Sequence, residues 1–406
     1  MDKEIYFNSR NTILDVLHDN GKSNRYFKND MELESEGDKV FNWSHFKEVI
    51  KNEITKFIYP FESIVVLAGA GASIVPGENG VPDTKFGFTV SLLAENINSI
   101  LKEDDTIYPV EELCRICKYA IPIEIDGKYN STFNLEDFLS KVITYEEYLE
   151  EETKKKYSKS KEKILSIIKE KTSYSYDRDK HNHGSLIKIL SSLHKAPNRL
   201  SIVTTNYDTL FEEAANHLGF TVFDGFSFDS NCIFDIDLFD WSLVKPIYNV
   251  KSEKLEYKKS SVNLLKIHGS LSWIKQDDNI ARVGKASSSD PIMIFPSSNK
   301  YSHSYEKPYF ELFSKFQELI KRPNTLLITT GFSFSDNHIS KMITQAIKSS
   351  PSLSLLCTSH TLEQKCSNKN WDELLELKND GYRICFLRAS LSGDLLDYFG
   401  GNSYDN

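Results

Sequence analysis

Short apolar runs alternate with longer amphipathic stretches along most of this chain. Apolar runs typical of buried strands occupy residues 64–68, 200–204, 262–267, 325–330, 352–357 and 382–387. Apolar residues at helical spacing occupy residues 44–57, 88–101, 210–218, 309–321, 336–348 and 361–377. Strands that alternate with helices indicate a parallel sheet with helices on both faces. The pattern therefore predicts an α/β fold with a doubly wound parallel sheet.

The pattern changes between residues 103 and 192, where helical spacing continues without clear strands. Residues 133–143 and 145–168 have this spacing, and residues 154–171 are rich in Lys and Glu. Such a charged run is typical of a solvated helix face. We therefore expect an inserted helical subdomain over residues 103–192.

The remaining chain divides into a sheet domain and two flanking segments. The sheet domain is expected to comprise residues 41–102 and 193–390. Residues 1–40 are polar and weakly periodic, which predicts an N-terminal arm, either mobile or in contact with another copy. Residues 391–406 are expected to form a C-terminal tail.

Net charge and hydropathy indicate which kinds of partner the chain is not expected to bind directly, namely nucleic acid and membranes. The 406 residues include 49 Lys and Arg against 58 Asp and Glu, a net charge of -9. The chain therefore has no global basic surface for nucleic acid, and no direct nucleic-acid site is expected. No apolar stretch approaches the roughly 18 residues of a membrane span. The N-terminus lacks the apolar region of a secretory signal, so we expect a cytoplasmic protein.

The cysteines give little indication of a metal site. Of the six, only Cys114 and Cys117 have the spacing of metal ligands, and no second pair follows at the required distance. Cys357 and Cys385 lie in apolar runs, as buried thiols do. We therefore expect no metal.

A turn of small residues follows the first predicted strand. In Gly69-Ala70-Gly71-Ala72-Ser73, the absence of bulky side chains lets backbone N–H groups approach a pyrophosphate, and Ser73 adds a hydroxyl. Strand, glycine turn and helix in this order are typical of a Rossmann-like nucleotide-binding unit. Ile74 stands where the third glycine of the usual motif would be. The alternative is a tight turn without a ligand.

A loop rich in Gly and Pro follows, over residues 77–83. Such a loop can fold over a ligand. Asp83 at its end is either a ligand contact or the N-cap of the next helix.

Polar side chains also follow two later strands. Thr205, Asn206 and Asp208 come after the strand at 200–204, and His268 follows the strand at 262–267. Ligands bind at this edge of open α/β sheets. Asn206 can hold a ribose hydroxyl or a water, and the His268 imidazole can accept a proton. The alternatives are helix caps for Asn206 and Asp208 and a structural role for His268.

These segments together resemble the sirtuin family of NAD-dependent enzymes. The family's Gly-Ala-Gly-x-Ser turn matches residues 69–73, its Gly-Ile-Pro-Asp loop resembles residues 80–83, and its catalytic His-Gly resembles His268-Gly269. The turn at residues 331–335 resembles the family's second nucleotide-contacting turn. The resemblance implies NAD as substrate and Asn206 and His268 as catalytic residues. The residues that it implies for binding NAD are Gly69, Ala70, Gly71, Ser73, Asp83, Thr205, Asp208, Gly331 and Ser333.

The chain departs from sirtuin deacylases in one important respect. It has no two-pair cysteine zinc module between His268 and Gly331. Its Thr-Thr-Asn-Tyr-Asp and Gly-Phe-Ser-Phe-Ser-Asp segments instead resemble the divergent bacterial sirtuin-like antiphage NADases. The resemblance implies an NAD+ glycohydrolase that depletes NAD during infection. In length, the chain resembles the separate sirtuin-like subunit that assembles with a HerA-like translocase ATPase. This resemblance implies a homo-oligomer with that ATPase as its partner. The alternatives are an NAD-dependent protein deacylase and a non-catalytic sensor of NAD or ADP-ribose.

Overall fold

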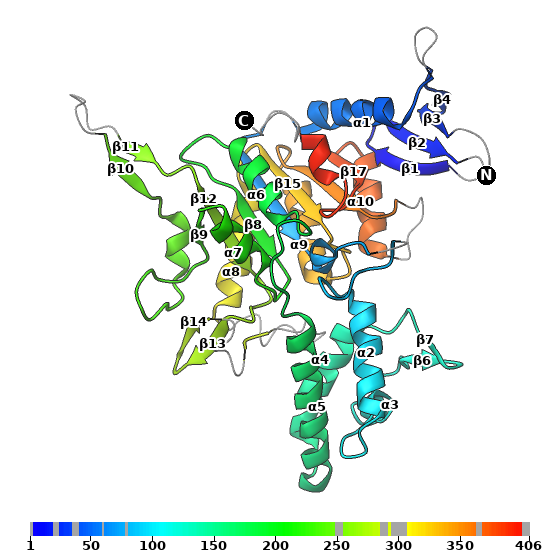
Figure 1. Ribbon diagram of the computed structural model, residues 1–406, viewed down its shortest axis with the longest axis vertical. Coiled ribbons are helices and arrows are strands. Elements are labelled where there is room, and N and C mark those ends of the chain that lie inside the picture. The colour runs from blue at the N-terminus through cyan, green and yellow to red at the C-terminus, as the bar shows by residue number, and fades with distance from the viewer. Residues whose placement is uncertain are drawn as a thin grey trace.

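The structure is a computed structural model that describes residues 3–18, 24–34, 40–58, 61–77, 80–247, 255–284, 291–293, 307–362 and 368–399. A large central sheet lies between helices, and a group of helices projects from one end (Figure 1). No helix within the described ranges has the length and apolar character needed to cross a membrane.

The centre of the sheet is parallel and has the strand order of a Rossmann-like fold. Its parallel strands run in the order β9 (Thr221–Phe223), β12 (Ser261–Lys266), β8 (Ser201–Thr204), β5 (Ser63–Ala68), β15 (Thr325–Thr330), β16 (Ser354–Ser359) and β17 (Ile384–Arg388). β5 pairs in parallel with β8 on one side and β15 on the other. The chain therefore reverses its direction of travel across the sheet between β5 and β15, where open α/β sheets bind ligands. The predicted α/β fold is confirmed.

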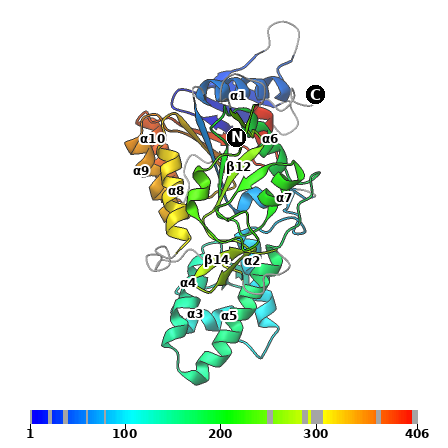
Figure 2. The same ribbon diagram turned by 90° about the vertical axis from the view of Figure 1, so that its left-hand side faces the viewer.

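Helices cover both faces because alternate strand residues point to opposite sides. In β5, Ile64, Val66 and Ala68 belong to one core, and Val65 and Leu67 belong to the other. The helices that pack on the first core are α1 (Trp43–Ile58), α6 (His183–Ser192) and α7 (Leu210–His217). Those on the second are α8 (Tyr309–Lys321), α9 (Asn337–Ser349) and α10 (Lys369–Asn379). Figure 2 shows the two layers on opposite sides of the sheet.

The N-terminal residues belong to the sheet, so the predicted arm over residues 1–40 is wrong for its described part. The strands are β1 (Lys3–Asn8), β2 (Ile13–Leu17), β3 (Arg25–Lys28) and β4 (Met31–Glu32). β1 pairs antiparallel with β17, with Phe7 opposite Leu387, and the other three strands follow outwards. Phe7, Leu14 and Val16 are buried, which ties the segment to the core.

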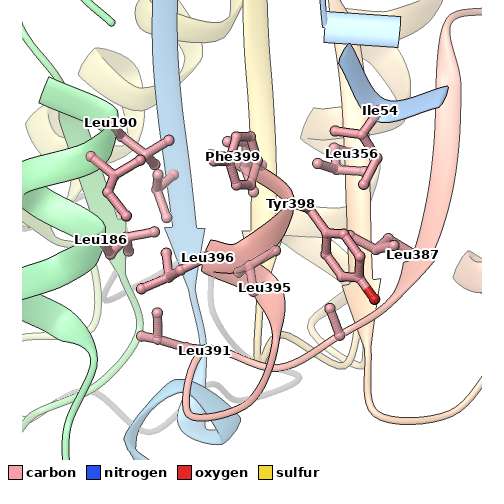
Figure 3. Packing of buried hydrophobic residues seen from close by; sticks show 14 of the residues in the cluster. Ile54, Leu186, Leu190, Leu356, Leu387, Leu391, Leu395, Leu396, Tyr398 and Phe399 are labelled. Carbon is pink, nitrogen blue, oxygen red and sulfur yellow. The ribbon is translucent and has the colours of Figure 1, made fainter. Parts of the chain in front are cut away.

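The predicted C-terminal tail is wrong for residues 391–399, whereas residues 400–406 lie outside the described ranges. The short 3-10 helix η7 (Leu395–Phe399) packs against α1 and α6. Leu391, Leu395 and Leu396 lie beside Leu186 and Leu190 of α6 (Figure 3). The end of the described chain therefore completes the first core.

The projecting helices form a separate core of their own. This helical unit contains α2 (Val90–Lys102), α3 (Val110–Ile116), α4 (Leu135–Tyr145), η3 (Glu146–Tyr148), α5 (Glu151–Lys171) and a hairpin of β6 (Glu124–Ile125) and β7 (Lys128–Tyr129). Its core gathers side chains from α2 to α5, with Leu93, Phe138 and Ile164 among them. The predicted boundaries at 103 and 192 are displaced, because α2 belongs to this unit and α6 packs on the sheet.

The 3-10 helix η1 (Ala70–Ser73) follows β5, and further short elements lie between β9 and α8. They are η4 (Ile236–Asp240), the hairpin of β10 (Val244–Pro246) and β11 (Leu255–Tyr257), and the hairpin of β13 (Trp273–Gln276) and β14 (Asn279–Arg282). The β10–β11 hairpin extends outwards at the left of Figure 1. η4 and the β10–β11 hairpin lie in the aromatic and irregular sequence between the strands at 200–204 and 262–267, and the β13–β14 hairpin follows β12.

Acid destabilisation is expected from a buried histidine in the first layer. His183 packs on Phe211 with ring centroids 4.6 Å apart, and burial lowers the pKa of His183 from 6.5 to about 3. Because the unfolded chain binds the proton first, stability should fall as the pH drops below 6.5, by up to about 1.4 kcal/mol per pH unit. Urea unfolding of His183→Leu should show a shallower decline between pH 6.5 and pH 4.5 (about two units below the unfolded pKa). Equal slopes in both proteins would contradict this assignment.

Candidate active site

Two adjoining cavities open at the carboxyl ends of β5, β8, β12 and β15. The first, the glycine cavity, has a volume of about 340 Å³ and is lined by the two glycine turns and by His268. The second, the asparagine cavity, has a volume of about 90 Å³ and is lined by Asn206, Asp208 and apolar side chains of the helical unit. The residues that line both are Ala70, Val90, Glu136 and Thr205. We refer to the two cavities together as the cleft.

The two glycine turns pack backbone against backbone. Gly69 N–H donates to Thr330 O at 3.0 Å, and Gly71 N–H donates to Gly331 O at 2.9 Å. A Cβ on Gly69 would lie 2.6 Å from Gly331 O, and a Cβ on Gly71 would lie 2.8 Å from Gly331 Cα. These glycines are therefore required by the contact between the ends of β5 and β15. Because their N–H groups bond to protein carbonyls, their expected role as phosphate donors is not supported by this geometry.

Gly331 is the most constrained of these positions. Its φ is +60°, and a Cβ there would overlap the backbone nitrogen of Ala72. We expect Gly331→Ala to lower the free energy of unfolding by about 2–4 kcal/mol, because strain and overlap act together. Gly127→Ala is the matched control, since Gly127 has a φ of +73° with nothing within 4 Å. Urea unfolding should show a clearly smaller loss for the control, and similar losses would contradict the role of backbone packing.

A chain of hydrogen bonds fixes Asn206 at the start of the asparagine cavity. Its Nδ2 donates to Gly69 O at 3.0 Å and to Ser73 Oγ at 2.8 Å. Ser73 Oγ in turn donates to Asp208 Oδ2 at 2.7 Å, and Asp208 Oδ1 accepts from Leu210 N at 3.2 Å. With its amide nitrogen held, Asn206 presents its carbonyl oxygen as the acceptor for a ligand. Ser73 and Asp208 therefore position Asn206. The Ser73 hydroxyl, which was predicted to contact phosphate, instead bonds to the side chains of Asn206 and Asp208.

A buried ion pair lies beneath this network. Lys266 Nζ lies 3.1 Å from Glu212 Oε1 and also donates to the backbone oxygen of Asp208. Burial raises the pKa of the Glu212 carboxyl, and the Lys266 charge opposes that rise. Lys266 thus connects the end of β12 to the segment that carries Asn206 and Asp208.

His268 lies in the glycine cavity just after β12, with only 5% of its surface exposed. Its Nε2 lies 3.4 Å from Asp336 Oδ2. Asp336 is also the N-cap of α9, since its Oδ1 accepts from His338 N at 2.9 Å and from Ile339 N at 3.2 Å. A carboxylate beside one ring nitrogen orients the imidazole and favours the proton on that nitrogen. Nδ1 is then the basic nitrogen.

The start of a helix also faces the glycine cavity. Thr89 caps α2 by accepting from Leu92 N at 3.1 Å, and Thr89 and Val90 both line the cavity. A helix N-terminus favours an anionic group through its N–H groups and its dipole. The helical unit therefore contributes a feature suited to phosphate to the lining of the glycine cavity.

The structure brings most of the predicted site residues together. Those that line the glycine cavity are Gly69, Ala70, Gly71, Thr205, His268, Gly331 and Ser333. Ser73, Asn206 and Asp208 line the asparagine cavity. Asp83 lines neither cavity, and its Oδ1 accepts from Lys85 N at 3.0 Å within the turn.

Among the residues of the cleft that were not predicted are Ser335, Asp336 and Glu136. Asp336 and Ser335 line the glycine cavity, and Glu136 of α4 lies where the two cavities meet. Asp336 stands at the start of the helix predicted at 336–348, and Asp is a preferred N-cap residue, so this position could have been identified from the sequence. Glu136 has no such signal, because it reaches the cleft only through the folding of the helical unit.

The described residues include no group of three or more His, Cys, Asp or Glu side chains that could hold a metal ion. Cys114 and Cys117, the pair with ligand-like spacing, are buried in the helical unit. Burial raises the pKa of the Cys114 thiol to about 12, as expected for a packed thiol rather than a ligand.

Comparison with known protein families agrees with this geometry. No curated protein matches the chain significantly. A SIR2-like domain model matches residues 200–378, which include Asn206, His268 and Asp336 together with β8, β12 and β15. SIR2-like family members are NAD-dependent enzymes, and the match is compatible with NAD-related activity. The matched segment is therefore similar to a SIR2-like domain, and the mostly parallel sheet that it helps to form is consistent with a Rossmann-like, sirtuin-type fold.

Proposed function

We propose that this chain hydrolyses NAD+ at the bond between nicotinamide and ribose. The products are nicotinamide, ADP-ribose and a proton, with water as the second substrate. The observation that carries the proposal is the convergence of the two glycine turns, Asn206 and His268 on one cleft, where the strand order of the sheet reverses.

The side chains of the cleft have distinct roles in this reaction. The pyrophosphate would lie in the glycine cavity, against Ala70, Ser333 and the start of α2. The Asn206 oxygen would accept a hydrogen bond from the ribose or the attacking water. His268 would accept the proton of that water or of a ribose hydroxyl, with Asp336 holding its ring. Positive charge that develops on the ribose as nicotinamide leaves would be stabilised by these fixed polar groups.

The shape of the asparagine cavity favours water as the acceptor. Its volume is about 90 Å³, and α2 and α4 of the helical unit supply apolar walls through Leu93, Leu135 and Leu139. Such a space suits a small group with one water. The absence of cysteine pairs after His268 supports the same choice, since sirtuin deacylases carry a zinc module there.

The biological role follows from the resemblance to antiphage NADases. Hydrolysis of NAD would deplete the cellular pool and stop growth during infection. We propose that the chain acts as a homo-oligomer in the cytoplasm and assembles with a HerA-like ATPase that restrains it until infection. Co-purification of the two proteins tests this assembly.

Occlusion of the cleft tests the proposed site without altering Asn206 or His268. Ala70 lies where the two cavities meet, so Ala70→Leu should fill the junction and lower kcat/KM for NAD by at least about tenfold, roughly 1.4 kcal/mol. Ala120→Leu, at an exposed alanine of the helical unit, is the matched control and should retain full activity. Nicotinamide release measures both. Full activity in Ala70→Leu would place the reaction elsewhere.

A further inference from the structure

We propose that a cationic cavity at the opposite edge of the sheet binds a phosphorylated nucleotide. This basal cavity has a volume of about 450 Å³ and lies between the end of α6, the start of β8 and the residues that lead into β12. Leu200 and Ser261 line it, so β8 and β12 begin at the basal cavity and end at the cleft. It is therefore separate from the NAD site.

The charge of the basal cavity is opposite to that of the whole chain. Its cationic lining residues are Lys188, Lys195, Arg199, Lys258 and Lys259. Among the described residues that line it, none is Asp or Glu, although the chain carries a net charge of -9. A concave site with one sign of charge concentrates ligands of the other sign. The lining therefore favours an anion.

Arg199 forms a fixed wall of this cavity. Its Nε donates to Asn263 Oδ1 at 2.6 Å, and its other nitrogens donate to the carbonyls of Trp241 and Phe239 at 2.7 Å. The guanidinium lies 3.8 Å from the centre of the Phe223 ring. Burial lowers the pKa of Arg199 to about 10, because desolvation disfavours the charge at a cost that Asp240 offsets only in part. A bound anion would offset that cost.

His194 and Ser191, which line the basal cavity, carry buried polar atoms without partners among the described residues. Within the described ranges, both ring nitrogens of His194 and the hydroxyl of Ser191 form no hydrogen bond, although each atom is buried. Buried polar groups are normally hydrogen-bonded, so unpaired groups indicate a missing partner. Phosphate oxygens accept from hydroxyl, imidazole and ammonium groups.

The apolar part of the lining points to more than inorganic phosphate. Phe220, Leu243 and Tyr257 provide surfaces on which a planar base can pack. The volume lies within the range of about 300–1,000 Å³ that is typical of small-molecule sites. Cationic and aromatic side chains together suit a nucleoside phosphate.

ATP titration of the full chain by calorimetry tests this proposal. Lys195→Glu combined with Lys259→Glu should weaken ATP binding at the basal cavity by at least about tenfold, since both lysines are exposed and line it. Lys155→Glu combined with Lys159→Glu, on the exposed face of α5, changes the net charge equally and should bind ATP as the wild type does. Nicotinamide release from NAD should be unchanged in both double variants, which keeps this test independent of the proposed function.

Each other outcome overturns the proposal. If the wild type did not bind ATP, or if all three proteins bound it equally, the basal cavity would not be an ATP site. Equal weakening in both double variants would indicate a non-specific charge effect. If inorganic phosphate bound the wild type as tightly as ATP does, the nucleotide base would not contribute to binding. Tighter binding of a single-stranded oligonucleotide, lost in Lys195→Glu with Lys259→Glu, would assign the surface to a nucleic-acid backbone instead.

Discussion

Asn206→Ala is expected to lower kcat for NAD hydrolysis by about two to three orders of magnitude, the range seen when one fixed polar group of an active site is removed. The substitution removes the carbonyl oxygen of a side chain that lines the asparagine cavity. It also removes the donor to Ser73 Oγ and one of two donors to Gly69 O, which still accepts from Ala72 N. Rates of nicotinamide release at saturating NAD, measured on folded protein, provide the comparison.

Ser73→Ala separates chemistry from positioning at this site. It removes the hydroxyl that links Asn206 to Asp208 and leaves the Asn206 oxygen in place. We expect a smaller loss of kcat than in Asn206→Ala, because the bond from Asn206 to Gly69 O remains. A wild-type rate in Asn206→Ala would exclude this residue from the reaction.

His268→Ala is expected to lower kcat/KM by about 10²–10⁴-fold, the usual contribution of general acid–base catalysis. His268 lines the glycine cavity, and it contacts the Asp336 carboxylate. Removal of the ring takes away the proton acceptor and leaves the glycine turns intact. NAD binding, measured by calorimetry, should change much less than the rate.

Asp336→Asn is the matched variant for this second prediction. Asparagine also caps helices, so α9 should keep its N-terminus while the carboxylate beside His268 is lost. We expect a loss of rate between those of the wild type and His268→Ala. If His268→Ala retained the wild-type kcat/KM, the assignment of the general base would be wrong.

The sequence pattern predicted those elements whose stability depends on burial in the centre of the sheet. The predicted bounds of β15 and α8 equal those of the structure, because both elements are strongly apolar and are flanked by polar residues. β1 and β2 were missed, since each places only a few apolar residues in the core. The burial of η7 depends on α1 and α6, and no local pattern indicates contacts between such distant segments.

The candidate site was predictable to the extent that it follows strand ends. Asn206 and His268 lie just beyond parallel strands, so their convergence follows from topology. The function of the glycines was not predictable, because the packing of Gly69 and Gly71 against Gly331 requires knowledge that β5 and β15 are neighbours. The contribution of the helical unit to the cleft was also not predictable, because it depends on how that unit packs beside the ends of the strands.

We propose that the cleft transfers ADP-ribose from nicotinamide to water. The most direct test is a time course of NAD, nicotinamide and ADP-ribose with the purified protein in the assembly in which it is isolated. We expect equimolar nicotinamide and ADP-ribose without any acylated peptide. Nicotinamide release that requires an acylated peptide, or binding of NAD without turnover, would contradict the account.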